Sequence, residues 1–166
     1  MPVSIPESGV TFGPYNEDDL FHIERWVKLS KLDKKGISSI EFILHCNRQT
    51  PKILLVEVKS SIPSDHKSFF AEIEKKFVDS LSLWVNMIHN RLNQDADLMG
   101  SNLFPQCAFV LPLKLLLVIP RMPDHFIQQA NDTFRKAMTH TRHLWGLEYT
   151  SILVLNERLA RQQSLI

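Results

Sequence analysis

The stretch that decides the fold spans residues 52–61 and has the sequence KILLVEVKSS. It puts apolar side chains on both faces of an extended strand, at Ile53, Leu54, Leu55, Val56 and Val58. Such a strand is typical of the centre of a covered sheet. Glu57 and Lys59 follow at its end and, because strand side chains alternate, they project from one face. Two charges there are costly unless they are paired, solvated or bound to an ion.

A second strand precedes this one. Ile37–Cys46 is dense in β-branched and aromatic residues, and Asn47–Pro51 has the composition of a turn. We therefore expect Ile37–Cys46 and Lys52–Lys59 to pair as an antiparallel hairpin. Glu41 lies inside the first strand, and the geometry of the turn decides whether Glu41 and Glu57 share a face.

The rest of the chain alternates between helical and extended patterns. The expected elements are an irregular lead-in over Met1–Tyr15, a helix after Asn16 to Leu29, the hairpin, a long helix over Asp65–Leu92 capped by Ser64, a polar connection over Asn93–Asn102, a strand over Leu113–Ile119, a helix over Asp124–His143, a strand over Tyr149–Leu155, and a short helix or frayed tail over Glu157–Ile166. This order predicts one α/β domain over residues 1–166, with a mixed central β-sheet flanked by helices on both sides.

Composition excludes several classes of protein. The 166 residues include 19 Lys and Arg and 18 Asp and Glu, which gives a net charge of +1. A charge this small produces no overall electrostatic attraction to nucleic acid or to a membrane surface. Two cysteines, Cys46 and Cys107, are too few for a disulfide framework or a structural zinc site. With no signal peptide pattern and no membrane span in the sequence, we expect a cytoplasmic protein without a membrane partner. Walker and dinucleotide motifs are also missing, which disfavours nucleotide-driven and nicotinamide-dependent functions.

Glu41, the group Glu57-Val58-Lys59 and the hydroxyl residues at 60–61 resemble the PD-(D/E)xK nuclease superfamily, the restriction-endonuclease-like fold. The resemblance extends from the first helix to the strand at Leu113. It implies an αβββαβ core, here with an added helix and strand. It also implies that Glu41 is the first acid, Glu57 the second and Lys59 the lysine, while Glu24 matches the acid that many members carry on their first helix.

The resemblance further implies a chemistry. Glu41, Glu57 and the carbonyl of Val58 would bind Mg²⁺ or Mn²⁺, and Glu24 would add an outer contact or bind a second ion. Lys59 would orient or help deprotonate the attacking water and stabilise the transition state. The implied activity is endonuclease hydrolysis of phosphodiester bonds, with DNA as the favoured substrate and RNA left open, by a homodimer or by one subunit of a larger complex.

Some features depart from the family pattern. Glu41 stands where the family usually has Asp, no Pro precedes it, and the long helix has Lys67, Lys75 and Lys76 in place of the glutamine of exonuclease-type members. Asp33, in a basic loop, is an alternative first acid that ranks below Glu41.

Two other functions remain open at this point. The first is a catalytically inactive protein of the nuclease fold that acts as a binding or assembly module. The second is an unrelated α/β binding protein, in which Glu57 and Lys59 are an ordinary ion pair at a strand end.

Overall fold

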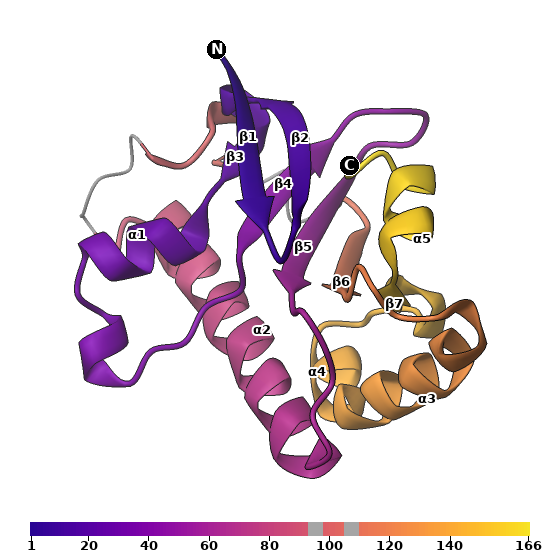
Figure 1. Ribbon diagram of the computed structural model, residues 1–166. Coiled ribbons are helices and arrows are strands. Elements are labelled where there is room, and N and C mark those ends of the chain that lie inside the picture. The colour runs from indigo at the N-terminus through magenta and orange to yellow at the C-terminus, as the bar shows by residue number, and fades with distance from the viewer. Residues whose placement is uncertain (93–97, 105–109) are drawn as a thin grey trace.

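The centre of the molecule is a five-stranded mixed β-sheet in the order β3-β4-β5-β6-β7 (Figure 1). A computed structural model describes residues 1–92, 98–104 and 110–166. The strands of this sheet are β3 (Leu20–Phe21), β4 (Phe42–Cys46), β5 (Lys52–Val58), β6 (Leu113–Val118) and β7 (Ile152–Leu155). β3, β4 and β5 pair antiparallel, whereas β5, β6 and β7 pair parallel. The predicted hairpin and the central position of Lys52–Lys59 are confirmed.

Helices cover one face of the sheet. They are α1 (Ile23–Leu29), α2 (His66–Ile88), α3 (Ile127–Ala137) and α4 (Thr139–Leu144). Alternate residues of the sheet, such as Leu55 and Leu117, share one core with the α2 residues Phe77 and Trp84. In chain order, α2 lies between β5 and β6, and α3 with α4 lies between β6 and β7. Within the described residues, no helix combines the length and apolar character needed to cross a bilayer.

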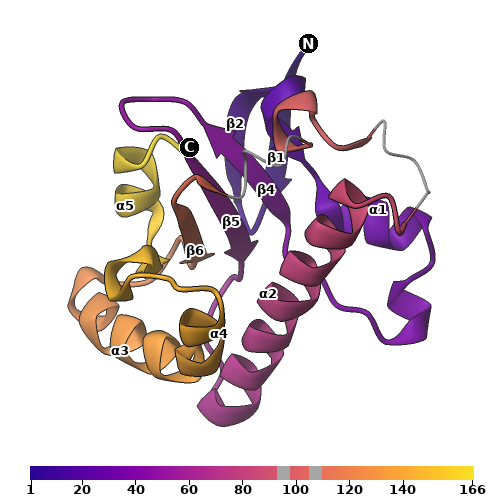
Figure 2. The ribbon, with the colours of Figure 1, turned by 180° about the vertical axis from the view of Figure 1, so that it is seen from behind.

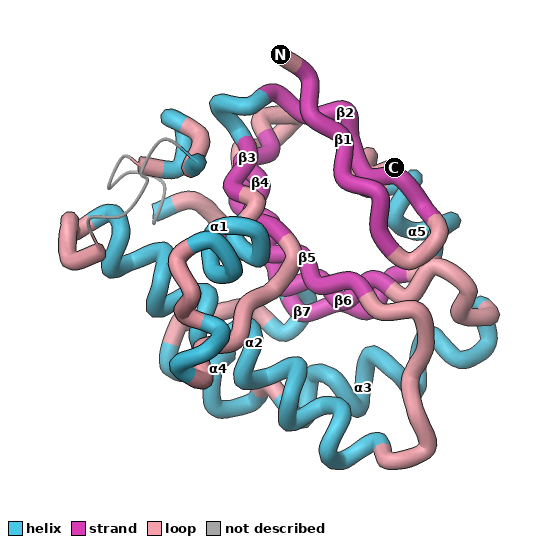
Figure 3. Tube along the Cα trace, turned by 60° about the vertical axis from the view of Figure 1, so that its left-hand side comes forward, coloured by secondary structure: helices cyan, strands magenta, loops and turns pink. Residues whose placement is uncertain are grey.

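The opposite face is covered in a way that the sequence analysis missed. A hairpin of β1 (Pro2–Glu7) and β2 (Val10–Asn16), together with α5 (Glu157–Gln162), lies over it (Figure 3). The prediction of an irregular lead-in over Met1–Tyr15 is therefore wrong, whereas α5 supplies a helix on this side as expected. Prolines are tolerated in a short two-stranded ribbon because its outer edges need no ladder hydrogen bond.

This second layer has its own core. Phe12 and Ile5 pair across the hairpin and pack with Leu54 and Val56, the residues of β5 that alternate with those facing the helices. Apolar residues on both faces of β5 are thus explained by two separate layers, and Glu57 belongs to the face covered by helices.

Several element boundaries also differ from expectation. Asn16 caps only a 3₁₀ turn at Glu17–Asp19, because Leu20 and Phe21 then pair with β4, and α1 begins at Ile23. Asp65, rather than Ser64, caps α2 by accepting a hydrogen bond from the Ser68 amide. The predicted helix over Asp124–His143 is divided at Met138, and the last strand begins at Ile152 after a 3₁₀ turn. Part of the predicted connection over Asn93–Asn102, and Cys107, lie outside the described residues.

The first testable prediction concerns the contact between the hairpin and the C-terminus. The Tyr15 hydroxyl donates a 2.7 Å hydrogen bond to the Leu165 carbonyl, which also accepts one from the Gly13 amide. Because the carbonyl keeps this second donor, Tyr15→Phe should lower the free energy of unfolding by about 1 kcal/mol. Urea denaturation measures this change. The control is Tyr149→Phe, at a half-exposed tyrosine, which should change stability little; equal stability of the two variants would contradict the assignment.

Candidate active site

The candidate site forms where β5 ends against the helical layer. Phe42 pairs with Val56, and the amide of Glu41 donates a 3.1 Å hydrogen bond to the Val56 carbonyl. Glu41, one residue before β4, therefore lies beside Glu57, one residue beyond Val56. The register left open by the sequence is settled by this pairing: the two acids occupy neighbouring positions of adjacent chain segments.

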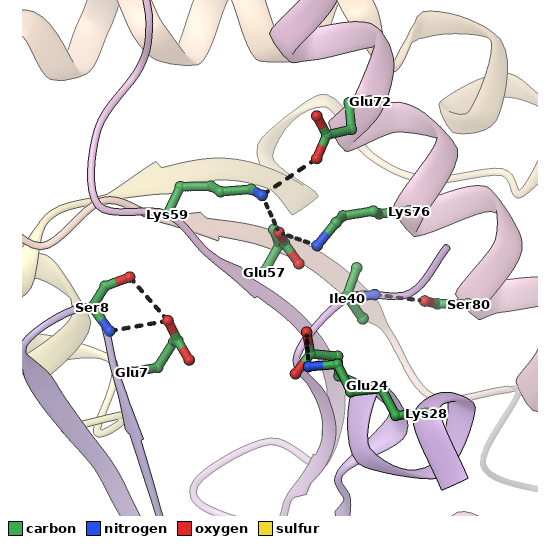
Figure 4. Close-up of polar contacts among 10 residues, drawn as sticks. All are labelled: Glu7, Ser8, Glu24, Lys28, Ile40, Glu57, Lys59, Glu72, Lys76 and Ser80. Carbon is green, nitrogen blue, oxygen red and sulfur yellow. Dashed lines mark hydrogen bonds and ion pairs between the residues drawn. The ribbon is translucent and has the colours of Figure 1, made fainter. Parts of the chain in front are cut away.

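Glu57 lies in a network of ion pairs (Figure 4). Its side chain has 0% exposure, and Oε1 accepts a 2.8 Å hydrogen bond from Nζ of Lys76 on α2. Nζ of Lys59 lies 3.5 Å from the same oxygen and 3.4 Å from Oε1 of Glu72. The other oxygen, Oε2, is buried and has no hydrogen-bond partner among the described residues.

Burial and the two lysines act in opposite directions on this network. Burial raises the pKa of Glu57, and the ammonium groups of Lys76 and Lys59 oppose that rise. For Lys59, burial lowers the pKa, but Glu57 and Glu72 more than compensate, so the pKa lies above its ordinary value. Lys59 is therefore a cation at neutral pH.

A second group of ligand atoms adjoins Glu41. Atoms of His22, Glu24 and Glu41 lie within 4.8 Å of one another. Glu24 is in the first turn of α1, His22 is the residue before that helix, and the Glu24 amide donates a hydrogen bond to the Glu41 carbonyl. Glu24 is 28% exposed and pairs at 2.9 Å with Lys28, so this side of the site reaches solvent.

Glu41 itself is a buried acid without a counter-charge in contact. Within the described part of the chain, its carboxyl group makes no hydrogen bond or ion pair. Burial first, and then the nearby charges of Glu57, Glu24 and Glu7, raise the pKa of Glu41 from an ordinary 4.5 to about 8. Burial also lowers the pKa of His22, which favours the neutral imidazole that binds metals.

Among the described residues, the ligand atoms of His22, Glu24 and Glu41 lie close enough together to bind one divalent cation, and Glu57 lies outside that group. Within the described residues, neither the Glu41 carboxyl group nor Oε2 of Glu57 has a hydrogen-bond partner, and a nearby cation would reduce the repulsion between the two acids. Carboxylate oxygens are ligands for Mg²⁺ and Mn²⁺, and an imidazole shifts the preference toward Mn²⁺. The donor set thus suits either ion.

The other candidates from the sequence lie apart. Asp33 is exposed in a 3₁₀ turn, and Lys75 pairs with Asp79 and the Gly36 carbonyl. Lys67 is exposed on α2. The Val58 side chain packs toward the hairpin layer, so Val58 has only its backbone carbonyl to offer. Of the three lysines singled out on the long helix, Lys76 is the one that contacts the acids.

Sequence reasoning missed His22 as a site residue. A helix running from Asn16 would place residues 22 and 24 about 200° apart around its axis, and so on opposite sides. Because α1 begins only at Ile23, His22 is outside the helix and turns toward Glu24. The sequence analysis placed Leu20 and Phe21 in a helix and did not recognise them as a strand, although that strand is what delays the start of α1.

Comparison with known proteins assigns no family and no function to this site. No model of a protein family matches the sequence, and neither a curated protein nor a solved structure matches the chain. The site is interpreted from its own residues.

A second testable prediction follows from the raised pKa of Glu41. An acid whose pKa is higher in the folded than in the unfolded state contributes stability below its unfolded pKa, and this stability is lost as pH rises through the folded value. The metal-free protein should therefore lose stability between about pH 5 and pH 8. In Glu41→Gln this loss should be smaller by roughly 2 kcal/mol.

Urea denaturation in EDTA at both pH values measures the difference. Glu148→Gln, at an exposed acid, is the control and should keep the pH dependence of the unaltered protein. An unchanged pH dependence in Glu41→Gln would show that Glu41 is already ionised in the folded state.

Proposed function

We propose that this protein is a metal-dependent nuclease of the PD-(D/E)xK type, which hydrolyses phosphodiester bonds in DNA. The observation that carries the proposal is the convergence of two buried acids, Glu41 and Glu57, with Lys59 at the end of a central strand. Glu24 joins them from the first helix. The arrangement supports the proposal because metal-assisted attack on a phosphodiester uses carboxylate ligands for a cation and a positive charge beside the phosphate.

The proposal includes the restriction-endonuclease-like fold. The chain order α1, β4, β5, α2, β6 supports it. The implied core has three strands between its two helices, whereas this chain has two, and β3 joins the sheet from a position before α1. This difference in the number and order of strands does not alter β5 and α1, which carry the site.

Glu41, Glu57 and Glu24, with His22 and the Val58 carbonyl, are the groups that would hold Mg²⁺ or Mn²⁺. Such a cation, when bound, lowers the pKa of water and neutralises charge on a phosphate. Lys59 keeps its proton and directs a positive charge toward the charge that develops on the phosphate in the transition state. Glu72 and Glu57 hold that ammonium group between them.

Lys76 has a supporting role in this proposal. Its side chain is 14% exposed and contacts Oε1 of Glu57, which leaves Oε2 available. Lys76 therefore orients the carboxylate and offsets the cost of burying it. It is a positioning residue, because its ammonium group contacts the acid.

A catalytically inactive binding or assembly module is the second candidate. It is favoured by the same ion pairs, because two ammonium groups already neutralise Glu57 without any metal. Metal binding discriminates between the two candidates.

The third testable prediction is therefore calorimetric. Titration with Mn²⁺ near neutral pH should show binding by the unaltered protein, weakened at least tenfold by Glu41→Gln or Glu57→Gln, since each removes a charged ligand. Glu72→Gln is the control, because Glu72 contacts Lys59 from the exposed side of α2. If the unaltered protein binds no Mn²⁺ at millimolar concentration, the nuclease proposal fails and the binding module is favoured.

The fourth prediction tests catalysis itself. With Mn²⁺ or Mg²⁺, the protein should cut at least one of linear, circular and single-stranded DNA. Lys59→Ala should slow cutting by about a hundredfold or more while retaining Mn²⁺ binding, because it removes transition-state stabilisation and leaves the ligands in place. Lys67→Ala, on the exposed side of α2, is the matched control. Undiminished cutting by Lys59→Ala would remove Lys59 from the mechanism.

A further inference from the structure

A pocket of about 740 Å³ begins directly after Lys59. Ser60 and Ser61 form part of its wall, and Ile119, which follows β6, forms another part. It lies between the N-terminal part of α2 and the start of α3, which Figure 2 shows on the same side of the sheet. The carboxyl ends of parallel strands are where open α/β sheets bind ligands, and the volume lies within the range of small-molecule sites.

One wall of the pocket is aromatic. Phe70 of α2 lines the pocket and is buried, whereas Phe126, just before α3, lines it and is 49% exposed. The Phe126 ring lies 4.2 Å from that of His125, centroid to centroid. A half-exposed ring beside a cavity offers a face on which a planar base can stack.

The polar groups of the pocket favour an anion. Arg121 is exposed and makes no hydrogen bond or ion pair within the described part of the chain. None of the described residues that line the pocket carries a carboxylate. Asp124, next to the lining, is held by Asn156 and Arg158 instead.

Arg121 also lies near the N-terminal hairpin. A Cβ atom built on Gly9 would lie 3.6 Å from Nη2 of Arg121, so the guanidinium group reaches the turn of the N-terminal hairpin. Glu7, the last residue of β1 before this turn, is close enough to Glu41 to raise its pKa. The pocket thus begins one residue after Lys59, and its Arg121 lies beside the turn that follows Glu7.

We propose that the pocket binds the nucleotide of the substrate strand next to the phosphodiester that is cut, with its base stacked on Phe126 and its phosphate paired with Arg121. The assignment rests on the proposed function. Ser60 and the amide of Gln129 supply hydrogen bonds to the sugar or the base edge. The pocket is therefore a strand-binding subsite, while the acids and Lys59 act on the neighbouring phosphate.

The test separates the pocket from the catalytic proposal by measuring nucleotide binding in EDTA. Deoxynucleoside 5′-monophosphates, titrated calorimetrically, should bind to the unaltered protein. Arg121→Gln and Phe126→Ala should each weaken binding about tenfold, since each removes a charged hydrogen bond or a stacking surface. Inorganic phosphate and free deoxynucleosides should bind more weakly than the nucleotides.

The controls are variants outside the pocket. Arg161→Gln and Tyr149→Ala remove an exposed arginine and a half-exposed aromatic residue that do not line it, and should leave nucleotide binding unchanged. Glu41→Gln should spare nucleotide binding in EDTA while it weakens Mn²⁺ binding. In cleavage assays, Arg121→Gln and Phe126→Ala should raise the KM for DNA about tenfold with little change in kcat.

The outcomes are distinguishable. Nucleotide binding that depends on Arg121 and Phe126 supports the pocket even if no DNA is cut, in which case the nuclease proposal alone fails. If the unaltered protein binds no nucleotide at millimolar concentration, or if Arg121→Gln and Phe126→Ala bind as the unaltered protein does, the pocket assignment is overturned. Binding of mononucleotides that a single-stranded oligonucleotide cannot displace would overturn its assignment to a strand.

Discussion

The ion pair between Glu57 and Lys76 is the constraint on which the site depends. A carboxylate with no exposure at the end of a central strand is costly, and the ammonium group 2.8 Å away offsets much of that cost. The same contact fixes the long helix against the sheet at this point and directs one carboxylate oxygen toward Lys76. The other oxygen has no partner among the described residues, so the interaction that stabilises the acid also leaves it with an unused ligand atom.

The two-layered cover of the sheet explains why the acids gather on one side. Leu54 and Val56 face the hairpin of β1 and β2, whereas Leu55 and Glu57 face the helices. The β4–β5 register then brings Glu41 beside Glu57, and the start of α1 adds Glu24 and His22. The parallel half of the sheet, β5 with β6, opens a pocket directly beyond the same strand end. Acids and pocket therefore share one edge of the molecule.

Sequence reasoning went furthest where local pattern and chemistry coincide. The apolar run before Glu57 indicated a central strand, and the polar turn indicated a hairpin, so Glu41, Glu57 and Lys59 could be grouped before any coordinates. The sequence analysis was wrong at the N-terminus, where the prolines led to the prediction of an irregular segment. The hairpin found there is stabilised by contacts of Phe12 and Tyr15 with residues distant in the chain. Sequence reasoning also missed His22, because the start of α1 depends on the pairing of Leu20 and Phe21 with β4.

By itself, the order of residues determined the class of fold, the central strand and the kinds of charged group at its end, because side-chain periodicity and composition are local properties. Only the tertiary structure decided that Lys76 contacts Glu57, that His22 lies with Glu24 and Glu41, and that a pocket opens after Lys59. Those relations join residues distant in the chain, and they arise from strand register and from the docking of helices, which no short stretch of sequence encodes.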